Sequence, residues 1–252
     1  MAIERQREAT ADRYGSAMVT ACLSPNRLLA ALPMAAFELL RPFLRTVEMV
    51  QGAILVAAGH RLTQVYFPHS GVISLVVSLA DGQRVEVAMI GRDSVFGGTA
   101  ALDGQISLTD AMVLLPGTAA ILDVDRLRSV SKQSSAFQTL LIRHEQALFA
   151  QAQQTAACNA AHAIEMRLAR SLLRMHDLSE ASLLSLTQDA LAQMMGVQRN
   201  SVSISAHALQ EAGVIKYSRG RIQITDLDGL KNLTCECYKA VADQYNRLLH
   251  DD

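Results

Sequence analysis

The sequence predicts an α+β fold in which an antiparallel β jelly roll is followed by a long helix and by a smaller helical unit ending in a β-hairpin. Short β-branched runs punctuated by glycine fill residues 47–124. Apolar positions at helical spacing then fill residues 134–175, and an alternating strand pair covers 214–224. A chain of 252 residues favours two ordinary cores over one large core.

Composition limits the possible functions. Half of the residues are hydrophobic, 19% are charged and the net charge is −1, so the chain is expected to be globular and any affinity for nucleic acid to come from a local patch. The lack of Trp argues against a stacking platform for single strands. Four irregularly spaced cysteines suit a reducing compartment. Without an apolar leader or a run long enough to span a bilayer, we expect a cytoplasmic protein with no membrane partner.

Residues 1–23 are expected to form a mobile polar segment, and residues 24–130 the β jelly roll. Val72–Leu79 and Arg84–Ile90 are joined through Asp81-Gly82, which is a strong hairpin signal. In the second of these runs apolar residues alternate with Arg84 and Glu86, which is typical of a half-buried strand.

Residues 131–158 are predicted to form one long helix. Its most regular part, Ser134–Ala157, is about 36 Å long at 1.5 Å per residue. That length exceeds what a small barrel covers and favours pairing between two subunits, although an amphipathic helix lying across its own barrel is the alternative. The predicted dimer-interface residues are Phe137, Leu140, Leu141, His144 and Leu148.

Residues 159–229 are predicted to form a winged helix-turn-helix domain. Thr187 can cap a first helix, and Gly196 can end it because glycine tolerates the left-handed conformation. A second helix is expected over Arg199–Ala212, with an apolar face on one side and a polar outer face. This arrangement is what insertion into the major groove of duplex DNA requires. The predicted DNA-contacting residues are Thr187, Gln198, Arg199, Asn200, Ser203, Ile204, His207, Lys216, Arg219 and Arg221.

Different chemistry is expected from the two parts of this predicted surface. Arg199 could donate two hydrogen bonds to guanine, and Asn200 could form a bidentate hydrogen-bonded pair with adenine. The basic residues of the hairpin, Lys216, Arg219 and Arg221, could contact phosphates. Residues 186–224 contain four basic and two acidic side chains, which gives a local positive excess on a nearly neutral chain.

Residues 187–202 follow the pattern T-x-x-x-(L/I)-(A/G)-x-x-x-G-x-x-R-x-(T/S)-V and thereby resemble the Crp/Fnr family of bacterial transcription regulators. A barrel ending at Asp125 and the long helix extend the resemblance over nearly the whole chain. The resemblance implies a cyclic-nucleotide-binding-like jelly roll that senses a small-molecule effector, with RNA polymerase as a partner. It also implies a homodimer that reads a palindromic operator, in which Arg199 is the base-reading arginine.

The predicted sensor departs from the family's ligand motifs. Members that bind cyclic nucleotides hold the ribose with Gly-Glu-x-x-Leu and the phosphate with Arg-Ser or Arg-Thr. Here Gly98 stands at the glutamate position, residues 105–110 contain no arginine, and Asp110 would repel a phosphate. Iron–sulfur members use an N-terminal cysteine cluster, of which only Cys22 is present. No cofactor is therefore expected, and the effector is unknown.

The main alternative is a cupin-like barrel metalloenzyme. It would need a His-x-His pair, which the sequence lacks, since His60 and His69 stand apart and a lone histidine is more often structural. The Cys235-Glu236-Cys237 pair has no evident second pair to complete a tetrahedral site, so we interpret it as part of a helix over Cys235–Leu249 within a C-terminal extension, 230–252. His162 and His176 are interpreted as structural. The sequence thus predicts no metal site and no catalytic residues.

Overall fold

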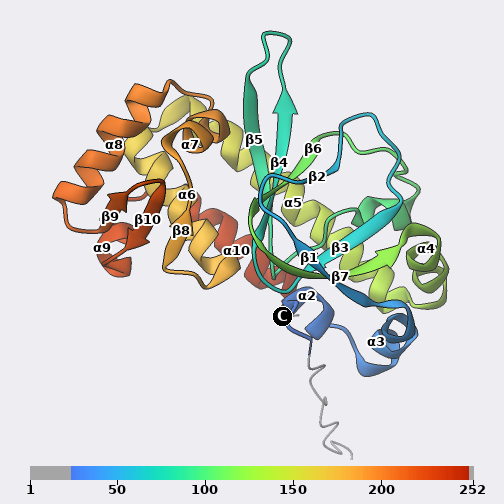
Figure 1. Ribbon diagram of the computed structural model, residues 1–252. Coiled ribbons are helices and arrows are strands. Elements are labelled where there is room, and N and C mark those ends of the chain that lie inside the picture. The colour runs from blue at the N-terminus through green and yellow to red at the C-terminus, as the bar shows by residue number, and fades with distance from the viewer. Residues whose placement is uncertain (1–23, 250–252) are drawn as a thin grey trace, which may run out of the picture.

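The computed structural model describes residues 24–249, so the predicted mobile segment 1–23 lies outside the described residues (Figure 1). The N-terminal part comprises α2 (Arg27–Ala30), α3 (Met34–Leu40), η1 (Arg41–Phe43), β1 (Arg45–Met49), β2 (Ile54–Val56), β3 (Gln64–Pro68), β4 (Val72–Ser78), β5 (Arg84–Ile90), η2 (Gly98–Leu102), β6 (Asp110–Leu115), β7 (Gly117–Asp123) and α4 (Val124–Gln133). The C-terminal part comprises α5 (Ser135–Ala161), α6 (Ile164–Ser179), β8 (Leu183–Ser185), α7 (Gln188–Met195), α8 (Arg199–Glu211), β9 (Ile215–Ser218), β10 (Arg221–Ile224), α9 (Leu227–Asn232) and α10 (Cys237–Leu249).

Two antiparallel sheets form the barrel, with strand orders β1-β7-β3 and β2-β6-β4-β5. The β4–β5 hairpin, expected from Asp81-Gly82, extends beyond the rest of the barrel (Figure 1). Gly82 has a φ of +86°, which explains the glycine at this turn. The predicted α+β architecture, with a barrel, a long helix and a winged helix-turn-helix, is confirmed.

Strand β5 does not have the half-exposed pattern that its sequence suggests. Glu86 is only 8% exposed and accepts a 2.5 Å hydrogen bond from the Ser74 hydroxyl. Glu86 is covered by helices, because Thr155 of α5 and Arg170 of α6 line the same small cavity. Ala88 and Ile90, farther along the strand, pack in the barrel core. The expectation that Arg84 and Glu86 share a solvated face is therefore wrong for Glu86.

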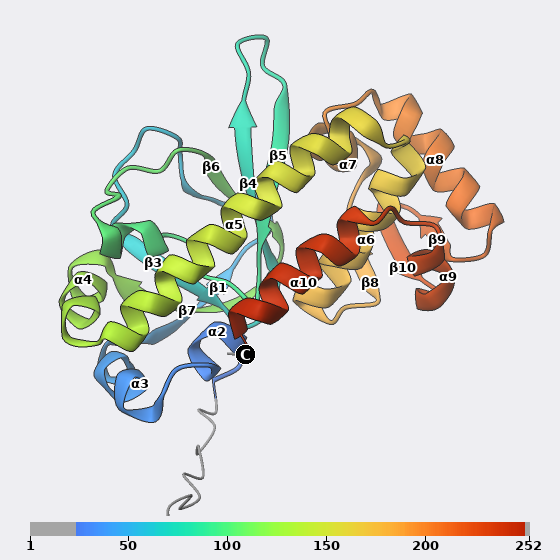
Figure 2. The same ribbon diagram turned by 180° about the vertical axis from the view of Figure 1, so that it is seen from behind.

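The long helix is shorter at its start and longer at its end than predicted. Residues up to Gln133 belong to the separate helix α4, and the Ser134 hydroxyl caps α5 by accepting from the Phe137 amide at 3.2 Å. Helix α5 then continues to Ala161 and runs diagonally across the back of the barrel (Figure 2).

Four of the five predicted dimer-interface residues lie inside the chain's own core. Phe137, Leu140 and Leu141 pack in the cluster that fills the barrel. His144 is fully buried and accepts from the Val95 amide at 3.2 Å. Assigning these residues to a dimer interface is wrong, because the apolar face they share is already covered by the barrel; Leu148 is half-buried.

The predicted C-terminal helical extension contains a helix that packs against the barrel and α5. Helix α10 returns along α5 (Figure 2) and places Val241, Tyr245 and Leu248 in the barrel's hydrophobic cluster. The helix begins at Cys237 rather than Cys235. The sequence predicted this helix but not the surface against which it packs. In residues 24–249, no helix is both long and apolar enough to cross a membrane.

Candidate DNA-binding unit and sensor cavity

Helix α7 begins and ends as its sequence predicts. The Thr187 hydroxyl accepts from the Ala190 amide at 3.1 Å, and Gly196 ends the helix with a φ of +63°. The Val197 amide then bonds to the Ala192 carbonyl at 3.0 Å, which fixes the turn into α8. The side chain of Arg167 on α6 donates to the Met195 carbonyl, so the end of α7 is also tied to the helix below it.

Helix α8 has the two faces required of a helix that reads a groove. Val202, Ala206 and Leu209 are buried against the domain core. On the other side Ile204 is 67% exposed, which is unusual for an isoleucine and leaves its methyl groups free to contact a thymine methyl. The exposed predicted DNA contacts on and beside α8 are Gln198, Arg199, Asn200, Ile204 and His207.

Ser203 differs from the other predicted contacts. It is half-buried, and its hydroxyl donates to the Gln188 side chain at 2.5 Å, linking α8 to α7. In this arrangement the Ser203 hydroxyl donates to α7 instead of being free. The position of Ser203 along α8 fits the outer face of the helix. The sequence alone therefore did not distinguish a contact with DNA from a contact with α7.

Arg199 is exposed but already has a partner. Its Nε lies 3.5 Å from an Asp189 carboxylate oxygen on α7, and both side chains are 64% exposed. An exposed pair of this kind contributes little to stability, so the guanidinium can leave it at small cost. His207 similarly lies 3.3 Å from Glu211, one helical turn away.

The wing is a three-stranded sheet in the order β8-β10-β9. The third strand, β8, was not predicted because it spans only Leu183–Ser185. Arg219 and Gly220 both have positive φ, +49° and +74°, which is the pattern of a tight two-residue hairpin turn. Arg219 therefore occupies the tip of the wing, with Arg221 and Lys216 exposed on its strands.

The barrel hairpin contacts the helix-turn-helix directly. A Cβ added at Gly196 would meet Val85 of β5 at 3.0 Å, and β5 packs against α7. A crevice beside this contact is lined by Asp81 and Arg84 from the hairpin and by Asp189 and Gln193 from α7. The barrel is thus in contact with the predicted DNA-reading unit as well as with the long helix.

A cavity of about 380 Å³ lies between the barrel and α5. Leu62, Leu75 and Phe96 line it from the barrel, and Leu148 and Phe149 line it from α5. The lining is mostly apolar, and no basic side chain of the described chain contributes to it.

Glu145 of α5 supplies a carboxylate to this cavity, next to the position where the family's glutamate is missing. A Cβ added at Gly98 would lie 3.0 Å from the Glu145 carboxylate. Asp110, expected to repel a phosphate, does not line the cavity; it accepts hydrogen bonds from the Ala58 amide and the Ser78 hydroxyl, both at 2.8 Å. The backbone hydrogen bond from Ala58 is the main cause of the lowered pKa of Asp110.

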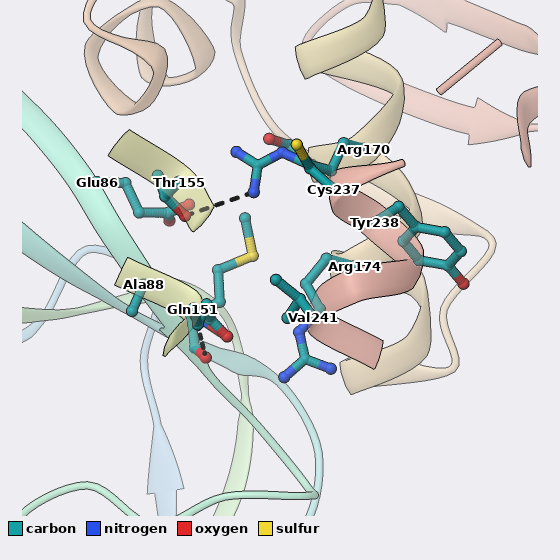
Figure 3. A pocket seen from close by; sticks show the side chains of 11 residues that line it. Glu86, Ala88, Gln151, Thr155, Arg170, Arg174, Cys237, Tyr238 and Val241 are labelled. Atoms are coloured by element: carbon teal, nitrogen blue, oxygen red, sulfur yellow. Dashed lines mark hydrogen bonds between the residues drawn. The ribbon is translucent and has the colours of Figure 1, made fainter. Parts of the chain in front are cut away.

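A buried polar junction connects the barrel, α6 and α10. Arg174 of α6 donates to Asp93 of the barrel at 2.8 Å, and its guanidinium lies 4.5 Å from the centre of the Tyr245 ring on α10. Burial alone would raise the pKa of Asp93, but the attraction of Arg174 and hydrogen bonds from Arg174 and Ser94 lower it below its usual range. Figure 3 shows Arg174 and Arg170 of α6 beside Gln151 and Thr155 of α5 at this junction.

Four side chains of the types that can ligate a metal meet where α5 ends. The ligand atoms of Cys158, His162, Cys235 and Cys237 all lie within 4.8 Å of one another. Burial raises the pKa of the Cys158 thiol to about 12. The interpretation that Cys235 and Cys237 have no second pair is wrong: Cys158 and His162 are four residues apart on one helix and supply it, a spacing that could have been noticed beside the Cys-x-Cys pair.

Two domain-family models match the chain. Residues 46–134 match the cyclic nucleotide-binding domain, and residues 166–233 match the Crp-like helix-turn-helix domain. A search of curated protein sequences gives no significant match.

Solved structures with the same fold include FixK2 from Bradyrhizobium japonicum, with a TM-score of 0.65 and 17% identity, covering 76% of this chain and 98% of that one. A putative Crp/Fnr regulator from Eubacterium rectale has a TM-score of 0.62 and 18% identity, covering 82% and 96%. A Crp/Fnr regulator from Thermus thermophilus has a TM-score of 0.58 and 23% identity, covering 75% and 97%. Both matched domains, in this order and on this fold, make the chain a DNA-binding transcription regulator of the Crp/Fnr family.

Proposed function

We propose that the protein works as a cytoplasmic homodimer, reads a palindromic operator and responds to an apolar or weakly cationic effector instead of a cyclic nucleotide. The observation that carries the effector class is the cavity between the barrel and α5. Its walls are mostly apolar, and Glu145 is the one ionisable side chain among the described residues that line it. A cyclic phosphate there would meet a carboxylate and no arginine, whereas charge-assisted hydrogen bonds are what hold such anions.

The outer face of α5 supports the proposed dimer. Ile142 and Phe149 are 42% and 65% exposed, and Ala156 follows at the same seven-residue spacing on the exposed side. Apolar residues repeating every seven positions form a seam between paired helices. Phe149 also lines the cavity, so a second α5 packed here would cover the cavity entrance and link effector binding to the dimer.

Dimerisation would place two copies of α8 on successive major-groove faces. A two-fold dimer binds half-sites about one helical turn apart, roughly 34–36 Å. The exposed arginines of α8 and the wing supply the base and phosphate contacts in this arrangement. RNA polymerase is the proposed protein partner, as the family resemblance implies, and no catalytic role is proposed for any residue.

Operator selection tests the DNA part of the proposal. The full-length protein is incubated with random duplexes, and bound sequences are recovered over several rounds. We expect a two-fold symmetric consensus with half-site centres about 10–10.5 base pairs apart. Enrichment of a single, asymmetric half-site would contradict the homodimeric mode of binding.

Thermal-shift measurements test the effector class. Small apolar amines and neutral apolar compounds are compared with cyclic nucleotides, on the wild-type protein and on Leu75→Gln, which places a polar group in the cavity wall. We expect an apolar ligand to raise the melting temperature of the wild type and to lose this effect in the variant, with no shift from cyclic nucleotides. A saturable shift with cyclic AMP or cyclic GMP would overturn the effector class without affecting operator binding.

A further inference from the structure

A cluster of three cysteines and one histidine lies at the joint between the sensor and the DNA-binding domain. Cys158 and His162 lie in the last turn of α5, where His162 is the C-cap. Cys235 and Cys237 come from the segment that leads into α10, about 75 residues later in the chain. Their four ligand atoms lie within 4.8 Å of one another, although nothing in the regulator's DNA-reading surface requires this.

Two distances within the cluster match those of one tetrahedral ion, and all the others are at most 4.8 Å. Zinc lies about 2.3 Å from thiolate sulfur and about 2.0–2.1 Å from imidazole nitrogen, so ideal tetrahedral geometry separates two sulfurs by about 3.8 Å, and a sulfur and a nitrogen by about 3.6 Å. Here the Cys158 and Cys235 sulfurs are 3.6 Å apart, and the Cys237 sulfur lies 3.5 Å from His162 Nδ1. An iron–sulfur cluster contains several metal atoms and would need its ligands farther apart.

His162 is oriented as a metal-bound histidine usually is. Its Nδ1 faces the sulfurs, and its Nε2 lies 3.3 Å from a Glu236 carboxylate oxygen. A carboxylate on the second ring nitrogen fixes the ring orientation and makes the first nitrogen a better ligand. Glu236 is well placed for this because it stands between the two cysteines.

The surroundings suit the negative charge of such a site. Three thiolates, a neutral histidine and a divalent cation carry a net charge of −1. The Gln154 side-chain amide donates to the Cys237 sulfur at 3.0 Å, and the Arg170 and Arg167 side chains both interact electrostatically with Cys158. Figure 3 shows Arg170 beside Cys237. All three cysteines are at most 3% exposed, which shields the site from water.

We propose that Cys158, His162, Cys235 and Cys237 bind one thiophilic divalent cation, with Zn²⁺ the best match to this ligand set. Binding forms three metal–sulfur bonds and one metal–nitrogen bond, and any thiol protons are released to solvent. The ion would fasten the start of α10 to the end of α5, one residue before the N-cap of α6. Metal occupancy would then stabilise the angle at which the DNA-binding domain leaves the long helix. This inference does not depend on the proposed effector or operator.

Cobalt titration of the reduced, metal-stripped, full-length protein tests the site, because tetrahedral Co²⁺ bound to thiolates gives intense visible bands and a sulfur-to-metal charge-transfer band. We expect these bands to saturate at one Co²⁺ per chain and to disappear when Zn²⁺ is added. The melting temperature should rise with Zn²⁺ and fall again with a chelator, since a ligand that binds only the folded state stabilises it.

Variants assign the ligands. Cys235→Ser and Cys237→Ser should lose the charge-transfer band, while Cys22→Ser, outside the described residues, and His60→Gln, an exposed histidine, should keep it. If a cysteine variant fails to fold, as judged by circular dichroism, His162→Gln and Glu236→Gln test the assignment of the ligands instead. We expect each to weaken Co²⁺ binding at least about tenfold while the protein stays folded.

Three results would overturn the proposal. The first is a weak, octahedral cobalt spectrum in the fully reduced protein. The second is binding that survives in Cys235→Ser or is lost in Cys22→Ser. The third is reconstitution of an iron–sulfur cluster with sulfide at these ligands, which would show that the site holds several metal atoms.

Discussion

Arg199 forms an exposed ion pair in the absence of DNA. Its ion pair with Asp189 lies on the surface that would face the major groove, and both side chains are 64% exposed. We expect Arg199→Ala to weaken binding to the selected operator by about 1–3 kcal/mol and to relax preference at one base pair. Fluorescence anisotropy with the operator and with random duplex measures the difference. Equal weakening on both duplexes would show that Arg199 contacts only the backbone.

The positive charge of Arg219 can be removed by a substitution that does not strain the backbone. Its φ of +49° lies in the left-handed region, which asparagine tolerates better than most residues. Arg219→Asn should therefore keep the wing folded and weaken DNA binding uniformly across sequences. The slope of the logarithm of the binding constant against the logarithm of the salt concentration should become smaller in magnitude by about 1. The measurement is the affinity for random duplex at several salt concentrations. An unchanged slope would show that the wing tip does not contact DNA phosphates.

Glu86 should make stability depend on pH. Burial, opposed by the Ser74 hydrogen bond and the charge of Arg170, raises its pKa from 4.5 to about 7. The folded state therefore binds more protons at this group than the unfolded state does between these values. The stability contributed by Glu86 is greatest below pH 4.5 and falls as the pH rises to 7. The loss attributed to this group is about 3 kcal/mol.

The test compares Glu86→Gln with the wild type by urea unfolding at pH 5 and pH 8. Glutamine cannot ionise, so the variant should lose most of the fall in stability between these two values. Glu38→Gln on the surface of α3, whose side chain is 42% exposed, serves as the control. A fall of the same size in wild type and Glu86→Gln would assign the pH dependence to other groups.

Among the elements, α5 has two apolar faces with different partners. The inner face is buried in the barrel, and the outer face exposes Ile142 and Phe149. Ile142→Lys with Phe149→Lys should convert the proposed dimer to a monomer, since a buried seam would then carry four like charges. Light scattering at micromolar protein gives the mass. Leu39→Lys on α3, another exposed apolar position, should leave the mass unchanged.

The sequence predicted features set by neighbouring residues better than it predicted which distant segments pack together. Thr187, Gly196 and the Arg199-containing helix follow rules that act within a few residues, and the structure has them as predicted. Which face of α5 meets the barrel depends on residues far away in the chain, so Phe137 and its neighbours were assigned to the wrong partner. Glu86 was misplaced for the same reason, because α5 and α6 cover a strand face that is polar in sequence.

At the scale of the whole molecule, sensor and DNA-binding domain meet through both apolar and polar contacts; Val72, Met89 and Leu115 of the barrel pack in the hydrophobic cluster of the DNA-binding domain. The Asp93–Arg174 pair is buried, and Gln51 of the barrel donates to the Ser185 carbonyl of the wing sheet at 2.7 Å. Asp93→Asn should destabilise the protein by about 3–5 kcal/mol, because it leaves the Arg174 charge buried and uncompensated. Chemical denaturation measures this cost. Adding Arg174→Met should recover a large part of it; a double variant as unstable as the sum of both single variants would argue against coupling.

The overall domain order was predictable from sequence. Both pairs of the Cys158 cluster are visible in the sequence, but their meeting in space was not predictable. Each half of the cluster consists of two residues whose local pattern fits an ordinary helix. Only the return of α10 brings the halves together, and no short-range signal indicates that return.

That return has a consequence for how the protein is made. Chains are synthesised from the N-terminus, and domains generally fold as they emerge. Here the barrel, complete in its strands by Asp123, receives Val241, Tyr245 and Leu248 only after the DNA-binding domain has been synthesised. Until α10 has been synthesised, the nascent barrel therefore exposes part of its apolar surface. A chain that is truncated before α10 leaves this surface exposed permanently. Premature termination should thus yield an incompletely packed barrel that proteases remove.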